Sequence, residues 1–343
     1  MSKKILVFEL NWLGDILFSV PLLKALKYSE PDVFIACAVV PRYADILRNT
    51  PWVDKIMPLS DDRGPFSIFE KLKFMNLAKK EKFDSCVLLK PSRSKAEMAS
   101  KIGIKKRIGF GGKVAPLTLE ITPPPGSLHR VDQLLALAEG MKIPLMGRKY
   151  EFPVSADDLE RAKKFLTDAG IDIKKPVVAF NPGGNWGPKR WPDENFADLA
   201  VMVLKEYKNV SLILTGANKD EAVASGIAAK VNSNRCVSMA GKTGLKVLGA
   251  IFKLCGLVVS ADSGPMHLAS AVGTKTLCLF GPTSPAITGP CGKGESVIIH
   301  HDISCEVPCY LDECRKGYIC MQNITVSEVF ESFQKAYDGQ TYK

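Results

Sequence analysis

The stretch from Leu257 to Pro282, LVVSADSGPMHLASAVGTKTLCLFGP, constrains the fold more than any other part of the sequence. Its apolar pattern predicts a buried strand over 257–260, a helix over 263–272 and a second strand over 276–280. The turns between these elements are short. A strand, a helix and another strand in this order form a unit of a parallel α/β sheet.

The first turn of this stretch carries residues suited to binding an anion. Ser263 suits the N-cap, Pro265 fits the first helical turn, and Gly264 lets the backbone approach a ligand closely. The positive end of the helix dipole suits a diphosphate, and Asp262 can accept hydrogen bonds from ribose or sugar hydroxyls. His267 lies four residues after Ser263, on the same helix face. An ordinary capped helix with a core histidine would explain the same residues, but the adjacent anion site favours a functional role.

The alternation of strands and helices begins at 3–10 and restarts after residue 151. Repeated β–α units in each half predict two parallel, doubly wound α/β domains, 1–150 and 151–343. Such sheets bind ligands at the carboxyl ends of their strands, so we expect a cleft between facing domains. No G-x-G-x-x-G follows the first strand of either half, which argues against a dinucleotide oxidoreductase.

Composition indicates a soluble globular protein, with 46% hydrophobic and 24% charged residues. No run approaches the ~18 apolar residues that a spanning helix needs. Glu9 and Asp15 interrupt the apolar N-terminus, which argues against a signal peptide. We therefore expect a cytoplasmic protein.

The net charge of +10 is concentrated in the first half of the chain, in basic clusters at 71–82, 93–95, 101–107 and 148–149. Nucleic acid, an anionic membrane or an acidic substrate could each be the partner, and a solvated basic surface would look the same. Because no nucleic-acid motif accompanies the charge, we expect no nucleic-acid partner.

Four of the ten cysteines are crowded into sixteen residues: Cys305, Cys309, Cys314 and Cys320. Without a secretory signal, disulfides are not expected. Four thiols could hold zinc or an iron–sulfur cluster, but the C-x2-C pair of common zinc sites is missing. We expect no metal, with this cluster as the alternative.

Two further strand-to-helix junctions carry candidate chemistry. Asp15 follows Asn11-Trp12-Leu13-Gly14 at the opening of a helix, where it could be a helix cap or a general base held ionised by the helix dipole. The segment NPGGNWGPKRWP (181–192) combines three glycines with Lys189 and Arg190, a phosphate site in type although not a Walker loop. Glu221, after the strand at 211–215, belongs to an acidic first helical turn.

Together these motifs resemble the heptosyltransferase family (glycosyltransferase family 9) that builds the inner core of lipopolysaccharide in Gram-negative bacteria. The resemblance covers nearly the full length and rests on NWLGD, NPGGNWGPKRWP, AGKTGL and DSGPMHLASAVGTKTLCLFGPTSP, in that order. The NWLGD form is more similar to the heptosyltransferase II branch than to the heptosyltransferase I branch.

The resemblance implies a GT-B fold in which residues 1–150 bind the acceptor and residues 151–343 bind ADP-heptose, with the last helix able to pack back on the N-terminal domain. It makes Asp15 the base for inverting attack by an acceptor hydroxyl. Lys189 would bind the diphosphate and offset charge on the departing ADP. The remaining donor residues that it implies are Asp262 for heptose hydroxyls, Ser263 and Gly264 for phosphate, His267 as support, Thr243 beside adenine and Glu221 at the ribose.

On the acceptor side, Asn11, Trp12, Arg93 and Lys95 are candidates for contact with the phosphates and carboxylates of the anionic lipid A–Kdo glycolipid. The resemblance implies no required cofactor besides the ADP-heptose substrate, and peripheral contact with the cytoplasmic face of the inner membrane. A relative using another core acceptor or nucleotide sugar is the alternative. A non-catalytic nucleotide-sugar-binding protein or a metal-binding scaffold is the alternative from another class; the intact Asp15 and Lys189 speak against the former.

Overall fold

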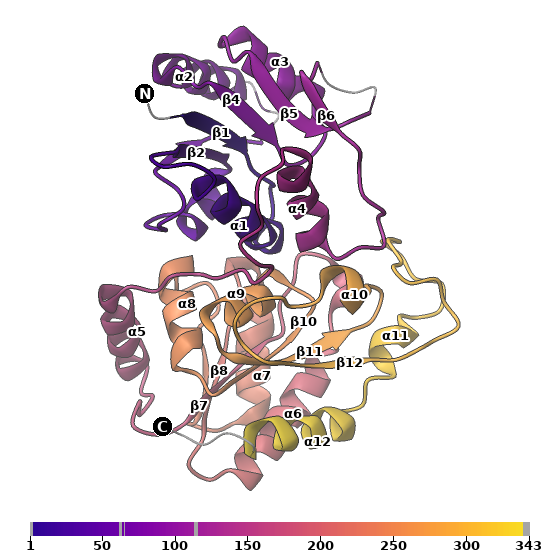
Figure 1. Ribbon diagram of the computed structural model, residues 1–343. Helices are drawn as coiled ribbons and strands as arrows, with labels where there is room; N and C mark the ends of the chain where they lie inside the picture. The colour runs from indigo at the N-terminus through magenta and orange to yellow at the C-terminus, as the bar shows by residue number, and fades with distance from the viewer. Residues whose placement is uncertain (1–2, 62–63, 65, 113–115, 339–343) are drawn as a thin grey trace. The chain divides into compact units, whose positions relative to one another are not determined.

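Alternating strands and helices build two parallel sheets in the computed structural model, which describes residues 3–61, 64, 66–112 and 116–338. The chain divides into two compact units, Met1–Tyr150 and Glu151–Lys343. All the strand pairs are parallel (Figure 1). The prediction of two doubly wound α/β domains is therefore confirmed.

The sheet of the N-terminal unit has the order β3-β2-β1-β4-β5-β6. Its strands are β1 (Lys4–Phe8), β2 (Phe34–Val39), β3 (Lys55–Pro58), β4 (Ser85–Leu88), β5 (Lys106–Phe110) and β6 (Leu119–Ile121). Its helices are α1 (Leu13–Lys27), α2 (Phe66–Glu81), α3 (Arg93–Lys101) and α4 (Arg130–Gly140). Buried side chains of α2 and α3 pack on one face of the sheet, while α1 and α4 pack together on the other (Figure 1).

The sheet of the C-terminal unit has the order β12-β11-β10-β7-β8-β9. Its strands are β7 (Val177–Asn181), β8 (Ser211–Leu214), β9 (Cys236–Ser238), β10 (Leu257–Ala261), β11 (Lys275–Phe280) and β12 (Ser296–His300). Its helices are α5 (Ala156–Asp168), α6 (Asp193–Glu206), α7 (Glu221–Val231), α8 (Leu245–Leu254), α9 (Gly264–Val272), α10 (Pro285–Thr288), α11 (Ile319–Gln322) and α12 (Val326–Asp338). Central strands such as β7 and β10 are buried throughout because helices cover both faces.

The last helix, α12, buries its apolar face in the C-terminal unit's own core. Val329 and Phe333 are fully buried, and α12 packs on α6, β11 and β12. Phe333 also lies edge-on to Phe180 of β7, with ring centroids 6.3 Å apart. Burial of one such side chain contributes roughly 1.5–3 kcal/mol. The family resemblance implied that the last helix could pack on the N-terminal domain. In the structure, the apolar face of α12 is buried by residues of the C-terminal unit, 151–343.

Two short elements differ from what the sequence predicts. The sequence at 43–49 predicts a helix, but the chain forms the 3-10 helix η1 (Pro41–Ile46), because Pro41 starts a tight turn directly after β2. The edge strand β6 was missed; it ends at Ile121, just before the run of three prolines at 123–125. Two more short 3-10 helices, η2 (Gly187–Lys189) and η3 (Asn218–Asp220), lie in loops of the C-terminal unit.

Candidate active site

The candidate donor site lies where the strand order of the C-terminal sheet reverses. The chain runs from β7 outward through β8 and β9, and later from β10 outward through β11 and β12. The two neighbouring strands β7 and β10 therefore lead their loops away to opposite sides, and open α/β sheets bind ligands at the carboxyl ends of the strands at such a point. The loops after these two strands carry Lys189 and Asp262, respectively.

Asp262 and Lys189 form an ion pair at this edge, with 2.7 Å between Lys189 Nζ and Asp262 Oδ2. The same carboxylate oxygen accepts hydrogen bonds from Thr283 Oγ1 at 2.7 Å and from Thr288 Oγ1 at 3.2 Å. His267 Nε2 lies 3.7 Å from Oδ1, which is beyond hydrogen-bonding distance. Asp262 thus lies beside four side chains, two from the loops after β7 and β11 and two from helices α9 and α10.

Burial shapes the charge of this cluster. Asp262 and His267 are 6% and 3% exposed. Burial by itself disfavours the Asp262 carboxylate, but the neighbouring His267 and the Lys189 charge outweigh it and hold the pKa of Asp262 well below its usual range. Asp262 is therefore ionised at neutral pH, and it holds the partly exposed Lys189 ammonium in a fixed position.

Ser263 occupies the N-cap position of α9, but its side chain does not cap the helix. Its hydroxyl instead lies 2.9 Å from Ser260 Oγ and 3.5 Å from Asn181 Nδ2, across the β7–β10 boundary. The predicted N-cap position of Ser263 is confirmed, but its hydroxyl interacts with these polar partners and not with an amide of the first helical turn. The Gly264 and Met266 amides belong to the first turn, where N–H groups have no partner within the helix.

The glycine-rich loop after β7 is held by a second buried carboxylate. Asp220 is 3% exposed and accepts hydrogen bonds from Arg190 Nη2 and from the Ala217 amide, both at 3.0 Å. Arg190 also donates to the Gly184 carbonyl at 2.7 Å. A Cβ on Gly183 would come within 2.5 Å of Asp220 Cγ, so the loop can close on Asp220 only with glycine there. Arg190 therefore shapes the loop that carries Lys189.

Thr243 and Glu221 lie at the same edge of the sheet but outside the Asp262 cluster. Thr243 is half-buried in the loop after β9, and Glu221 is exposed at the first residue of α7. Among the residues that the structure describes, neither side chain has a hydrogen bond to Lys189 or Asp262. Thr283 and Thr288 were missed by sequence reasoning; the available signal was the GPTSP segment directly after β11, the strand beside β10.

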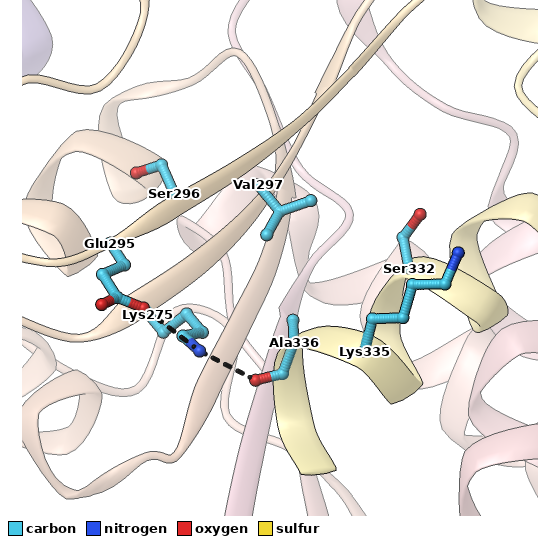
Figure 2. A pocket seen from close by; sticks show the side chains of 7 residues that line it. All are labelled: Lys275, Glu295, Ser296, Val297, Ser332, Lys335 and Ala336. Atoms are coloured by element: carbon cyan, nitrogen blue, oxygen red, sulfur yellow. Dashed lines mark hydrogen bonds and ion pairs between the residues drawn. The ribbon is translucent and has the colours of Figure 1, made fainter. Parts of the chain in front are cut away.

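A cavity of about 460 Å³ in the C-terminal unit lies at the opposite edge of the sheet. Figure 2 shows Lys275 at the start of β11 and Glu295 to Val297 at the start of β12, facing Ser332, Lys335 and Ala336 of α12. Lys275 Nζ donates to the Ala336 carbonyl at 3.1 Å, which ties α12 to the sheet. Because this cavity is at the amino ends of the strands, it is separate from the donor site.

The N-terminal unit places Asp15 in the first turn of α1, at the carboxyl end of β1. The N-cap is Trp12, whose side chain makes no capping hydrogen bond. Asp15 is a half-buried carboxylate whose charge the helix dipole stabilises, and its role, as helix cap or as general base, stays a prediction. Trp12 is 53% exposed, and its ring lies 5.9 Å from the Arg42 guanidinium.

The three other candidate acceptor residues, Lys95, Asn11 and Arg93, differ in their interaction partners and in their exposure. Lys95 Nζ donates to the Glu9 carbonyl at 3.0 Å, so it bridges β1 and the start of α3 across the reversal point of this sheet. Burial lowers the pKa of Lys95. The Asn11 carbonyl accepts from Arg42 Nη2 at 3.4 Å. Arg93 pairs with Glu97 at 2.8 Å and is exposed. Arg42, which sequence reasoning missed, joins Asn11 and Trp12.

Glu9 is a buried carboxyl group beside this edge. It is 1% exposed and accepts a hydrogen bond from Ser19 Oγ at 3.0 Å. Burial raises its pKa from 4.5 to about 7. The folded state therefore holds a proton that the unfolded chain releases, so this group's contribution is most favourable below pH 4.5 and is lost as pH rises to about 7.

The variant Glu9→Gln is expected to gain stability relative to the natural protein as pH rises from about 4.5 to about 7. The rise of this pKa from 4.5 to about 7 corresponds to a relative gain of about 3 kcal/mol in the free energy of unfolding. Denaturant unfolding at several pH values measures it, with the exposed pair member Glu97→Gln as control. A difference between variant and natural protein that does not change with pH would contradict the buried, protonated Glu9.

The four crowded cysteines, Cys305, Cys309, Cys314 and Cys320, are unpaired thiols. Burial raises the pKa of Cys320, which disfavours the thiolate that a metal requires. Within residues 3–338 as far as the structure describes them, no group of three or more His, Cys, Asp or Glu side chains is arranged to hold a metal ion. In the same described residues, no helix is long and apolar enough to cross a bilayer.

Two doubly wound parallel units are the architecture of GT-B glycosyltransferases, and the solved structure of the Escherichia coli ADP-heptose lps heptosyltransferase II has the same fold. It superposes with a TM-score of 0.82 at 24% identity, covering 97% of this chain and 98% of that one. The fold class is therefore GT-B.

Residues 72–318 match the model of glycosyltransferase family 9 (heptosyltransferase), and the chain belongs to this family. It is a glycosyltransferase. The chain is 28% identical to lipopolysaccharide heptosyltransferase 2 of Salmonella typhimurium over 306 residues, which cover 86% of this chain and 87% of that one. It is 29% identical to lipooligosaccharide heptosyltransferase 2 of Haemophilus influenzae, over 86% and 88%.

Proposed function

We propose that this glycosyltransferase moves heptose from ADP-heptose to the inner core of lipopolysaccharide, onto an acceptor that already carries a first heptose on Kdo–lipid A. Its relatives named heptosyltransferase 2 support this choice of reaction. The observation that carries the donor assignment is the Lys189–Asp262 ion pair at the reversal point of a parallel sheet, beside the N-terminus of α9.

In the proposed reaction, residues 151–343 bind the donor and residues 1–150 bind the acceptor. The Asp15 carboxylate takes the proton of an acceptor hydroxyl as its oxygen forms a bond to the anomeric carbon of heptose. The bond between that carbon and the diphosphate oxygen breaks, and its electron pair leaves with ADP. Attack from the side opposite the leaving group inverts the anomeric configuration.

The charge that develops on the departing diphosphate falls beside Lys189, which offsets it. The amides of Ser263 and Gly264 bind phosphate oxygens, and Asp262 faces the heptose hydroxyls while it holds Lys189. His267 supports this corner, Thr243 edges the adenine, and Glu221 reaches the ribose. On the acceptor side, Asn11, Trp12, Arg93 and Lys95 contact the anionic core sugars. The reaction requires no cofactor besides the donor.

The experiment assays the purified protein with a panel of nucleotide sugars against Kdo–lipid A acceptors with and without one heptose. We expect transfer from ADP-heptose to the acceptor that bears one heptose, with inverted configuration in the NMR spectrum of the product. Transfer from another nucleotide sugar alone, or to another acceptor alone, would identify a different reaction of the same family and overturn the proposed substrates.

A further inference from the structure

Helix α2 (Phe66–Glu81) carries large apolar side chains on its outer face. Ile68, Phe69, Leu72 and Leu77 are 62%, 72%, 51% and 47% exposed. Among them, Ile68 and Leu72 are four residues apart and Phe69 and Leu72 are three apart, so these three side chains are neighbours on the helix surface. They form one contiguous apolar patch. Such a patch indicates an interaction site, whereas scattered single apolar residues on a surface are normal.

The inward face of the same helix fixes the direction in which this patch points. Phe74 and Ala78 are buried in the core of the N-terminal unit, and the Phe74 ring lies 6.1 Å from the Phe8 ring of β1. At 3.6 residues per turn, Phe69 and Leu72 project about 140° and about 160° away from Phe74. A surface helix normally presents polar residues there. The apolar side chains on the outer face of α2 therefore do not contribute to the core of the N-terminal unit.

Lysines surround this apolar patch. Lys73, Lys79, Lys80 and Lys82 are exposed on α2 or directly after it. The two acidic residues of the helix offset little of this charge, because Glu81 is already paired with Lys55 and Lys4, which leaves Glu70. Exposed apolar residues flanked by lysines on one helix are typical of a segment that lies in the interface of an anionic membrane.

We propose that the outer face of α2 docks the protein on an anionic lipid bilayer. Ile68, Phe69 and Leu72 enter the boundary between headgroups and acyl chains, while the lysines contact lipid phosphates. The inference rests on the proposed function in one respect: the proposed acceptor is a membrane glycolipid, which is the reason to expect a bilayer as the partner. Glycosyl transfer itself does not require the basic cluster at 71–82, and the proposal gives this cluster a role.

The test is flotation of the full-length protein with vesicles that contain neither acceptor nor donor, so the result is independent of the transfer reaction. One set is made of phosphatidylethanolamine and phosphatidylglycerol, the other of phosphatidylcholine. We expect the protein to bind the anionic set and to be released as salt is raised. Absence of binding to the anionic vesicles would overturn the proposal, whatever the outcome of the substrate assays.

Variants locate the surface. The double variant Phe69→Ser/Leu72→Ser is expected to bind anionic vesicles at least about 10-fold more weakly, and so is Lys79→Glu/Lys80→Glu. The matched control Ile173→Ser/Val201→Ser replaces apolar residues of 42% and 46% exposure in the C-terminal unit and should bind as the natural protein does. Thermal unfolding establishes that each variant is folded. Unchanged vesicle binding by folded Phe69→Ser/Leu72→Ser would overturn the proposal, as would sedimentation showing that this variant instead loses self-association.

Discussion

The variant Asp15→Asn lowers kcat by about 100- to 10,000-fold if this carboxylate is the general base, while the affinity for ADP-heptose stays the same. Asparagine keeps the size of the side chain but cannot accept the proton. Asp15 lies in the first turn of α1, so loss of its charge also removes about 0.3–1 kcal/mol of interaction with the helix dipole. That cost is too small to unfold the chain.

The measurement combines steady-state kinetics with calorimetric titration of the donor. Asp45→Asn is the matched control, since Asp45 is an exposed carboxylate of the same unit that pairs with Arg48. A folded Asp15→Asn protein with undiminished kcat would show that another group takes the proton.

The variant Lys189→Met is expected to lower kcat/KM by about 100- to 1000-fold, because it removes the cation that we propose to face the charge developing on the leaving diphosphate. It also leaves the buried Asp262 carboxylate with only its uncharged hydroxyl donors and His267. An uncompensated buried charge destabilises a fold by about 3–5 kcal/mol, so stability must be measured alongside activity.

Two further variants separate these effects. Lys189→Arg keeps the charge and should recover a part of kcat/KM, whereas Lys189→Met/Asp262→Asn should recover stability without recovering activity. Lys230→Met removes an exposed lysine paired with Glu194 and serves as the control. If Lys189→Met were folded and fully active, the diphosphate would have to be neutralised elsewhere.

Much of the fold was predictable because parallel α/β units leave strong local signals. Fully buried strands such as β10 and the periodic helices between them are specified within a few residues. The weaker elements were misjudged where the signal is short: β6 has three residues, and η1 resembles the first turn of an α-helix. Tertiary packing, which no local pattern reports, decides such cases.

The residues of the candidate site could be predicted from the sequence, but the hydrogen bonds and ion pairs between them could not. Lys189, Asp262 and Asp15 stand out because charged residues after a buried strand reach the ligand-binding edge. The sequence cannot show that Asp262 is already bonded to Lys189, Thr283 and Thr288, since the first of these pairs joins residues 73 positions apart. The same reason hides the contact of the Ser263 hydroxyl with Asn181, which is 82 positions away.

The reversal of strand order in the C-terminal sheet has a consequence for the time at which activity arises during synthesis. Lys189 follows the first strand of this unit, but its partner Asp262 follows the fourth, and Thr283 and Thr288 follow the fifth. A ribosome-bound chain that ends before β10 contains β7, β8 and β9 but lacks Asp262, Thr283 and Thr288 of the proposed donor site. The proposed donor site is therefore complete only after the chain has been synthesised as far as Thr288, and we expect truncated chains that end before β10 to be inactive.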